Sequence, residues 1–245
     1  MKIKQMTKWY CSYMGMTVLF MFGVLALLYL LSYVMLISSS ETNFTIHGSE
    51  VATAITLFIS GIAMFAAALR FGCTNGLSRK AVFLGSCTGL AVTCIAVMVG
   101  NLVLLWVGIL TRGEGNSSFL YALYQEYMEQ AQPVMRWLLS ALWLFGVTAA
   151  AMLTGMVVGG IYYRLGRIGR VLWAAGLPVT LFVILPLVLS VSGKSTMHTL
   201  LNIVSAFATF LLATPLHLLL VLLGCILVLL GVDWLLMRRA PIQAA

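Results

Sequence analysis

A short segment that resembles a phosphate-binding loop is the first candidate for chemistry in this chain. The sequence SGKST at residues 192–196 matches the end of a P-loop, in which a glycine-rich turn and a lysine bind nucleotide phosphates at a helix start. The full pattern also requires a glycine at position 188, where this chain has Val188, and a soluble strand before the loop. We therefore interpret the segment as a solvated turn and expect no ATPase site in this chain.

The cysteines and histidines are too scattered to suggest another reactive site. Disulfide frameworks and zinc sites need Cys or His at short spacing, and the five cysteines form no close pair. The three histidines form no HExxH motif, and no GxSxG motif supplies a serine nucleophile. We expect neither a catalytic residue nor a metal or cofactor bound by this chain itself.

The composition assigns the chain to the membrane. Hydrophobic residues make up 62% of it, charged residues only 8%, and the mean hydropathy is +1.07, whereas about a quarter of the residues in soluble domains are charged. The net charge of +8 would suggest nucleic acid as the partner of a soluble protein. In a membrane protein the basic residues lie in the loops beside the bilayer. The expected partner is therefore the lipid bilayer and not nucleic acid.

Six segments are apolar and long enough to cross a bilayer as helices, which requires about 20 residues each. The first follows a basic start, as in a secretory signal, but its apolar run exceeds the usual length of about 7–15 residues. We read it as a retained span. The sequence thus predicts an all-α integral membrane protein, with residues 1–245 forming a single transmembrane domain. The predicted spans are residues 15–36, 51–69, 82–110, 137–161, 171–191 and 218–236.

The distribution of basic residues predicts the orientation. With the N-terminus in the cytoplasm, eleven of the fourteen Lys and Arg residues lie on the inner side, and only Arg112, Arg136 and Lys194 lie outside. The positive-inside rule therefore predicts that both termini are cytoplasmic. Asp233 is expected near the inner headgroups, and no ionisable residue is expected near a midplane, which disfavours a proton-coupled carrier.

Pro215 is expected to break the long apolar stretch from residue 199 to residue 236. An unbroken helix of that length would be nearly twice as long as the hydrocarbon core is thick. If both pieces crossed, Arg238 and Arg239 would lie outside, against the charge rule. We therefore expect a re-entrant segment at residues 199–215, in which Thr199 to Ala213 enters the outer leaflet and returns.

Two segments have the pattern of helices at the membrane surface. In residues 1–14, apolar side chains at helical spacing oppose Lys4 and Lys8, which predicts a separate interfacial elbow helix. Outside, Ser117 to Gln130 has an N-cap serine and an apolar, aromatic face. This outer helix either anchors the chain among headgroups or gates a substrate.

Small and hydroxyl residues on the spans have two interpretations each. Gly155 and Gly159 form a GxxxG motif that lets another helix approach closely, either within the subunit or at a dimer interface. Hydroxyl and amide side chains either bond their own helix or line a transport pathway. The candidate pathway residues are Thr53, Thr56, Ser60, Thr93 and Asn101.

The basic segment RFGCTNGLSRK, residues 70–80, separates the second and third spans. Gly72 and Gly76 are expected to free the backbone for a turn, Asn75-Gly76 is a turn signal, and Ser78 can begin the next helix. The segment is either a basic turn anchored to anionic lipid or a rigid element that a cytoplasmic partner contacts.

This pattern, Phe-Gly followed by polar residues and Ser-Arg-Lys before a long third span, resembles the ABC-2-type permease subunits of ABC transporters. It is most similar to the compact six-span permeases of Gram-positive bacteria, such as those of phenol-soluble-modulin exporters. The resemblance implies a type V exporter fold with an elbow helix, in the bacterial cell membrane. It also implies that this segment docks onto a separate cytoplasmic ATPase subunit, which holds ATP and Mg. The residues that would couple to the ATPase are Phe71, Gly72, Asn75, Gly76, Ser78, Arg79 and Lys80.

The same resemblance implies a second permease copy or paralogue and a transport function. Spans without charged residues suit an amphipathic or hydrophobic cargo, such as a peptide, a lipid-like compound or a drug. Small outer loops leave no room for a receptor domain, which favours export. The alternatives are a membrane partner or sensor subunit that transports nothing, and a secondary carrier.

Overall fold

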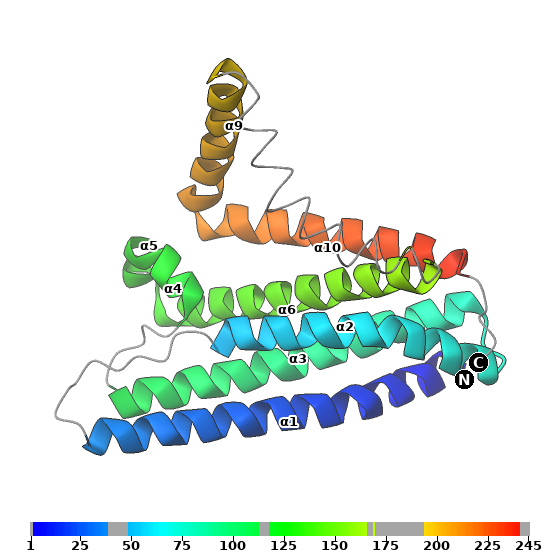
Figure 1. Ribbon diagram of the computed structural model, residues 1–245. Helices are drawn as coiled ribbons and strands as arrows, with labels where there is room; N and C mark the ends of the chain where they lie inside the picture. Colours follow the sequence, from blue (N-terminus) through cyan, green and yellow to red (C-terminus); the bar gives the residue numbers. More distant parts are fainter. Residues whose placement is uncertain (1, 39–48, 113–117, 166–168, 170–193, 241–245) are drawn as a thin grey trace.

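The computed structural model describes residues 2–38, 49–112, 118–165, 169 and 194–240 (Figure 1). All secondary structure within these ranges is helical, as the sequence predicts. The predicted span at residues 171–191 lies outside the described residues. The helices are α1 (Lys2–Ser38), α2 (Ser49–Thr74), α3 (Arg79–Arg112), α4 (Phe119–Leu123), α5 (Gln125–Gln130), α6 (Pro133–Arg164), α9 (Lys194–Ala213) and α10 (Pro215–Arg238).

Five of these helices, α1, α2, α3, α6 and α10, are long and apolar enough to cross a membrane. Each contains one of the predicted spans. In water, five such helices would expose many large apolar side chains on the outside of the bundle. The protein is therefore a membrane-embedded helical protein.

The five long helices lie side by side and form a bundle with two ends (Figure 1). We call one end the basic end: it holds the start of α1, the turn between α2 and α3, and the last turns of α6 and α10. The other end is the acidic end. It holds the first turn of α2, which contains Glu50, and the short helices α4 and α5, the second of which contains Glu126 and Glu129. The basic side chains described at the basic end are Lys4, Lys8, Arg70, Arg79, Lys80, Arg164, Arg238 and Arg239.

Helix α1 differs from the predicted pair of an elbow helix and a first span. It runs without interruption from Lys2 to Ser38, so residues 1–14 do not form a separate helix. The reason is packing against α3: Met6, Tyr10 and Met14 are buried on α1. On α3, Gly85 and Gly89 leave room for the Met6 and Tyr10 side chains, which an added Cβ would overlap. A continuous buried face keeps the helix straight through the predicted elbow.

The closest backbone approach in the described bundle joins α2 and α6. An added Cβ at Gly155 would overlap the Phe58 carbonyl oxygen, and one at Gly159 would overlap that of Ile62. From α2, Gly61 lies equally close to the Met152 carbonyl oxygen. The GxxxG motif thus lies in a helix interface within this chain.

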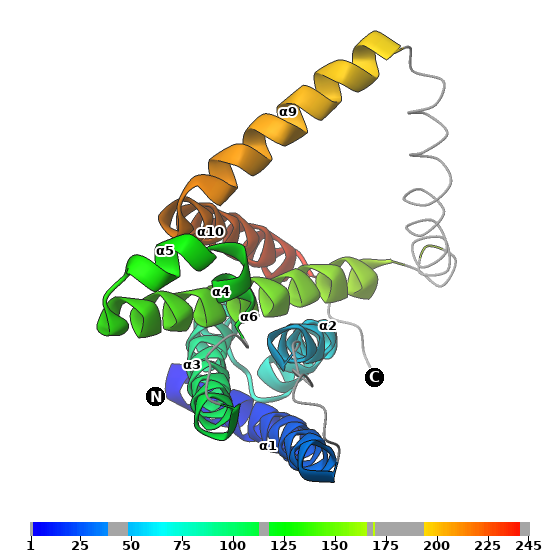
Figure 2. The ribbon, with the colours of Figure 1, turned by 90° about the vertical axis from the view of Figure 1, so that its left-hand side faces the viewer.

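The chain breaks between α9 and α10, where Pro215 was expected to interrupt it. Thr214 is extended (φ −150°, ψ 146°), and Pro215 occupies the first turn of α10. The structure differs from the predicted re-entrant path, however, because α9 is one uninterrupted helix with no turn inside residues 199–213. This segment contains no Gly or Pro that could reverse it. Figure 2 shows α9 projecting away from the bundle.

The outer helix expected at residues 117–130 is two short helices, α4 and α5, which meet at Tyr124. Its first capping residue is Ser118, whose side chain makes no capping hydrogen bond. Leu120, Tyr124 and Met128 are buried in a cluster with Leu139 of α6. Tyr124 of the apolar, aromatic face thus packs on the bundle, whereas Phe119, Leu123 and Tyr127 of that face are exposed.

Candidate coupling turn and its anchors

The turn between α2 and α3 is a glycine-terminated helix end. Gly76 has a positive φ of +61°, which allows the Leu77 amide to donate to the Gly72 carbonyl (2.8 Å) and the Gly76 amide to donate to the Cys73 carbonyl (3.2 Å). These two bonds form a Schellman motif, which satisfies carbonyls at the end of α2. The Asn75-Gly76 signal in the sequence thus has the predicted local structure.

Helix α3 starts as the sequence predicts, but Gly72 has another role than expected. The Ser78 hydroxyl accepts a hydrogen bond from the Ala81 amide (3.3 Å), which is an N-cap contact. Gly72, in contrast, is helical and buried in α2, so it does not make the turn. An added Cβ there would overlap the Val82 side chain, so the glycine permits α2 and α3 to approach closely.

An aromatic stack attaches the turn to α1. The Phe71 ring lies 4.4 Å from that of Trp9 at an interplanar angle of 10°. Beneath them, Met6, Ala68 and Val82 form a buried apolar cluster. The predicted coupling residue Phe71 therefore faces the protein, where it links α2 to the start of α1.

Two arginine side chains, Arg79 beside the turn and Arg164 at the end of α6, contact the end of α10. Arg79 Nη1 donates to the carbonyl oxygens of Arg238 (2.5 Å) and Met237 (3.4 Å), and Arg164 Nη2 donates to that of Leu236 (2.6 Å). The last carbonyls of a helix have no partner within the helix and carry partial negative charge, so cations stabilise this end. The Arg79 contact could not be predicted from the sequence, because the two residues that it joins are 159 positions apart.

The seven predicted coupling residues divide into two groups in the structure. Phe71, Gly72 and Arg79 are buried or half-buried and contact other helices. The remaining four form an exposed tip that no other described helix covers. These tip residues are Asn75, Gly76, Ser78 and Lys80.

Comparison of the chain with protein families, with curated proteins and with solved structures finds no match. The turn between α2 and α3, with its contacts to α1 and α10, is therefore the basis for a proposed function.

The candidate pathway residues are not brought together as one surface. Thr53, Thr93 and Asn101 are buried, and Thr56 and Ser60 are half-buried. Every hydroxyl among them donates to a carbonyl of its own helix at 2.8–2.9 Å. Asn101 Nδ2 donates to the Val97 carbonyl (3.0 Å) and reaches Thr53 Oγ1 at 3.5 Å. These contacts match the structural interpretation of the polar residues.

Glu50 is a buried carboxylate at the acidic end. Oε1 accepts from the Phe119 amide (3.3 Å) and Oε2 accepts from Trp143 Nε1 (3.1 Å). One side chain thus joins α2 to α4 and α6. Its place in the first turn of an apolar helix was the only signal in the sequence, and that signal names no partner.

We expect Glu50→Ala to lower the free energy of unfolding by about 1–3 kcal/mol, because it removes the acceptor of two partly buried hydrogen bonds. The measurement is thermal or denaturant unfolding of the full-length protein in detergent. Glu126→Ala is the matched control, since Glu126 is exposed, and its effect should stay within about 0.5 kcal/mol. Equal effects of the two substitutions would contradict the role of Glu50.

Asp233, which the sequence places near the inner headgroups, is buried among the helices. Its side chain is 1% exposed, and neither carboxylate oxygen has a hydrogen-bond partner among the described residues. Tyr10 and Cys87 lie within electrostatic range, and Trp234 next to it packs on Phe83. A buried charge without a partner costs several kcal/mol. The Asp233 carboxylate is therefore an unfavourable group within α10.

Proposed function

We propose that this chain is the transmembrane permease subunit of an ATP-driven exporter of the ABC-2 type. It would act with a separate ATPase subunit and with a second permease chain, identical or related. The observation that supports the proposal is the turn at residues 70–80. It presents an exposed tip and is anchored to α1 by Phe71 and to α10 by Arg79.

A force applied to the tip would be passed to several helices at once. The turn is continuous with α2 and α3, the Trp9 stack connects it to α1, and the Arg79 guanidinium connects it to the end of α10. An ATPase that binds this tip differently in two nucleotide states would bias the positions of all four helices, since only a difference in binding free energy can shift a conformational equilibrium.

The proposal places both termini and the turn in the cytoplasm of a bacterial cell. The clustering of eight described cations at the basic end supports this orientation through the positive-inside rule. Cys73 is exposed at the turn. A membrane-impermeant thiol reagent should therefore label Cys73 in inside-out vesicles but not in intact cells.

We propose an amphipathic or hydrophobic cargo, such as a peptide, a lipid-like compound or a drug. The long helices carry few charged residues between the two ends of the bundle. A strongly charged cargo would meet no compensating charge there, whereas an apolar surface would be accepted at little cost.

The experiment that tests the function uses inside-out vesicles from cells that contain the full-length chain and the ATPase subunit that co-purifies with it. We expect ATP to drive uptake of a fluorescent amphipathic peptide into these vesicles, and a non-hydrolysable ATP analogue to fail. Lys80→Glu should abolish both uptake and co-purification of the ATPase. Because an acidic residue is favourable in the first turn of a helix, this substitution should not unfold α3.

The control is Lys4→Glu, which makes the same charge change at an exposed position of the basic end and should leave uptake intact. Uptake driven by an ion gradient without ATP would instead identify a secondary carrier. No uptake and no ATPase partner would identify a non-transporting membrane partner or sensor. Either result would overturn the proposal.

A further inference from the structure

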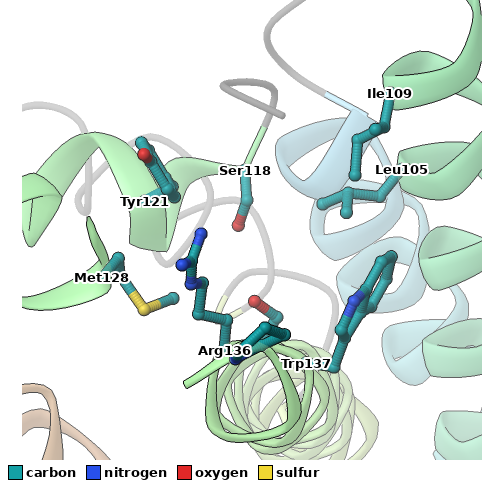
Figure 3. Close-up of a pocket in the computed structure, with 9 residues that line it drawn as sticks. Leu105, Ile109, Ser118, Tyr121, Met128, Arg136 and Trp137 are labelled. Atoms are coloured by element: carbon teal, nitrogen blue, oxygen red, sulfur yellow. The ribbon is translucent and has the colours of Figure 1, made fainter. Parts of the chain in front are cut away.

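A small cavity lies at the acidic end, between the end of α3, the α4–α5 segment and the start of α6 (Figure 3). Its volume is about 240 Å³. Leu105 and Ile109 of α3, Met128 of α5 and Trp137 of α6 form apolar walls. Polar side chains also line it, among them Arg136, Ser118 and Ser140. The cavity thus combines hydrocarbon walls with a cation, at the end of the bundle opposite the turn.

Arg136 brings a positive charge that the described protein does not neutralise. Its Nε donates to the Ala131 carbonyl (2.9 Å), and no carboxylate among the described residues pairs with the guanidinium. The nearby carboxylates bond to other groups: Glu50 accepts from Phe119 and Trp143, and Glu129 accepts from Gln125. The terminal amino groups of a half-buried arginine therefore remain available for an anion.

Ser118 supplies a second, independent indication of a ligand. It is 2% exposed, and its hydroxyl has no hydrogen-bond partner among the described residues. Ser118 lies at the N-cap position of α4, but its side chain makes no capping hydrogen bond. Figure 3 shows its oxygen directed into the cavity, toward the Arg136 side chain. A buried hydroxyl without a partner costs free energy that a hydrogen-bonding ligand would recover.

We propose that this cavity binds the phosphate group of an anionic membrane lipid, with Arg136 pairing with the phosphate and Ser118 donating to it. The planar guanidinium matches the oxygens of a phosphate in two parallel hydrogen bonds. The site lies away from the coupling turn, so it does not depend on the proposed function.

The size and surroundings of the cavity favour a lipid headgroup over a whole small molecule. Cavities for drug-sized ligands have about 300–1,000 Å³, so a cavity of about 240 Å³ holds a headgroup while the hydrocarbon chains stay outside. Val134 and Leu138, next to the cavity on α6, are 76% and 51% exposed on the outside of the bundle. The chains of a bound lipid would lie along this apolar surface, and Trp137 suits the level of the headgroups.

Native mass spectrometry of the full-length protein in a neutral maltoside detergent tests the site. The probes are phosphatidylglycerol, phosphatidylcholine with the same acyl chains, and inorganic phosphate. We expect phosphatidylglycerol to bind at least about tenfold more tightly than phosphatidylcholine, and Arg136→Gln to abolish this preference. Ser118→Ala should weaken phosphatidylglycerol binding several-fold without lowering the melting temperature, because the hydroxyl makes no bond within the described protein.

The matched control is Arg70→Gln, an exposed arginine at the basic end, which should keep the preference. Equal binding of the two lipids to the wild type, or the same loss in Arg70→Gln as in Arg136→Gln, would overturn the proposal. Binding of inorganic phosphate as tight as that of phosphatidylglycerol would identify a site for a soluble anion and would also overturn it. If Arg136→Gln fails to fold, Ser118→Ala decides: unchanged phosphatidylglycerol binding would refute the site.

Discussion

Gly155→Leu is expected to lower the free energy of unfolding by about 3 kcal/mol or more, the upper range for overpacked helix contacts. The reason is that α2 and α6 meet backbone to backbone at this position: even a Cβ would overlap the Phe58 carbonyl oxygen. Where the obstacle is a flexible side chain, a new rotamer can relieve an overlap. Here the obstacle is backbone, so the two helices must separate, and they lose the close contact that holds helices together in lipid.

The measurement is unfolding of the purified full-length variant in mixed micelles, with size-exclusion chromatography to assess the folded fraction. Gly155→Ala should have the same direction and a smaller effect, about 1–3 kcal/mol. The matched control is Gly23→Leu on α1, since no atom lies within 4 Å of a Cβ added there, and it should be tolerated. If Gly155→Leu were as stable as Gly23→Leu, the α2–α6 contact would not be the close one that the structure has.

The sequence predicted the long helices because the length of an apolar run depends only on neighbouring residues. The turn signal Asn75-Gly76, the N-cap Ser78 and the break at Pro215 are equally local, and the structure has all of them. The elbow at residues 1–14 is different. Its amphipathic pattern suits a membrane surface and an interface with α3 equally well, and only the glycines of α3 decide between these two environments.

The anchors of the candidate site could not be predicted, because they join residues that are far apart in the sequence. A basic residue beside a turn gives no indication of whether its side chain points to water or to another helix. In the structure Arg79 bonds to carbonyls of α10, while its neighbour Lys80 is exposed. Glu50 is a similar case, since its partners Phe119 and Trp143 lie on two other helices.

The two ends of the bundle rely on different polar contacts, which has a consequence for movement. At the basic end, arginine side chains donate to carbonyls at the end of α10. Such contacts can be exchanged one helix turn at a time, because each carbonyl offers a similar acceptor. At the acidic end, Glu50 has two specific donors, from α4 and α6. We therefore expect the α10 end to move more readily than the α2–α4–α6 junction when the proposed ATPase changes state.

Arg79→Gln and Lys80→Glu are expected to separate transmission from docking in the proposed exporter. Lys80 belongs to the exposed tip, so Lys80→Glu should prevent the ATPase from binding. Arg79 faces α10, so Arg79→Gln should leave ATPase association within about twofold while peptide uptake falls about tenfold or more. The glutamine loses hydrogen bonds to the Met237 and Arg238 carbonyls, each worth about 1.5–3 kcal/mol when the donor is charged.

Hydrogen exchange of the last turn of α10 gives a readout that does not depend on transport. Faster exchange is expected in Arg79→Gln and not in Lys80→Glu, because only the first removes a partner of α10. Arg79→Lys should restore part of the uptake, since an ammonium group can still donate to one of the two carbonyls. Loss of ATPase association in Arg79→Gln to the same extent as in Lys80→Glu would place Arg79 in the docking surface. The link from the turn to α10 would then not be what transmits the movement.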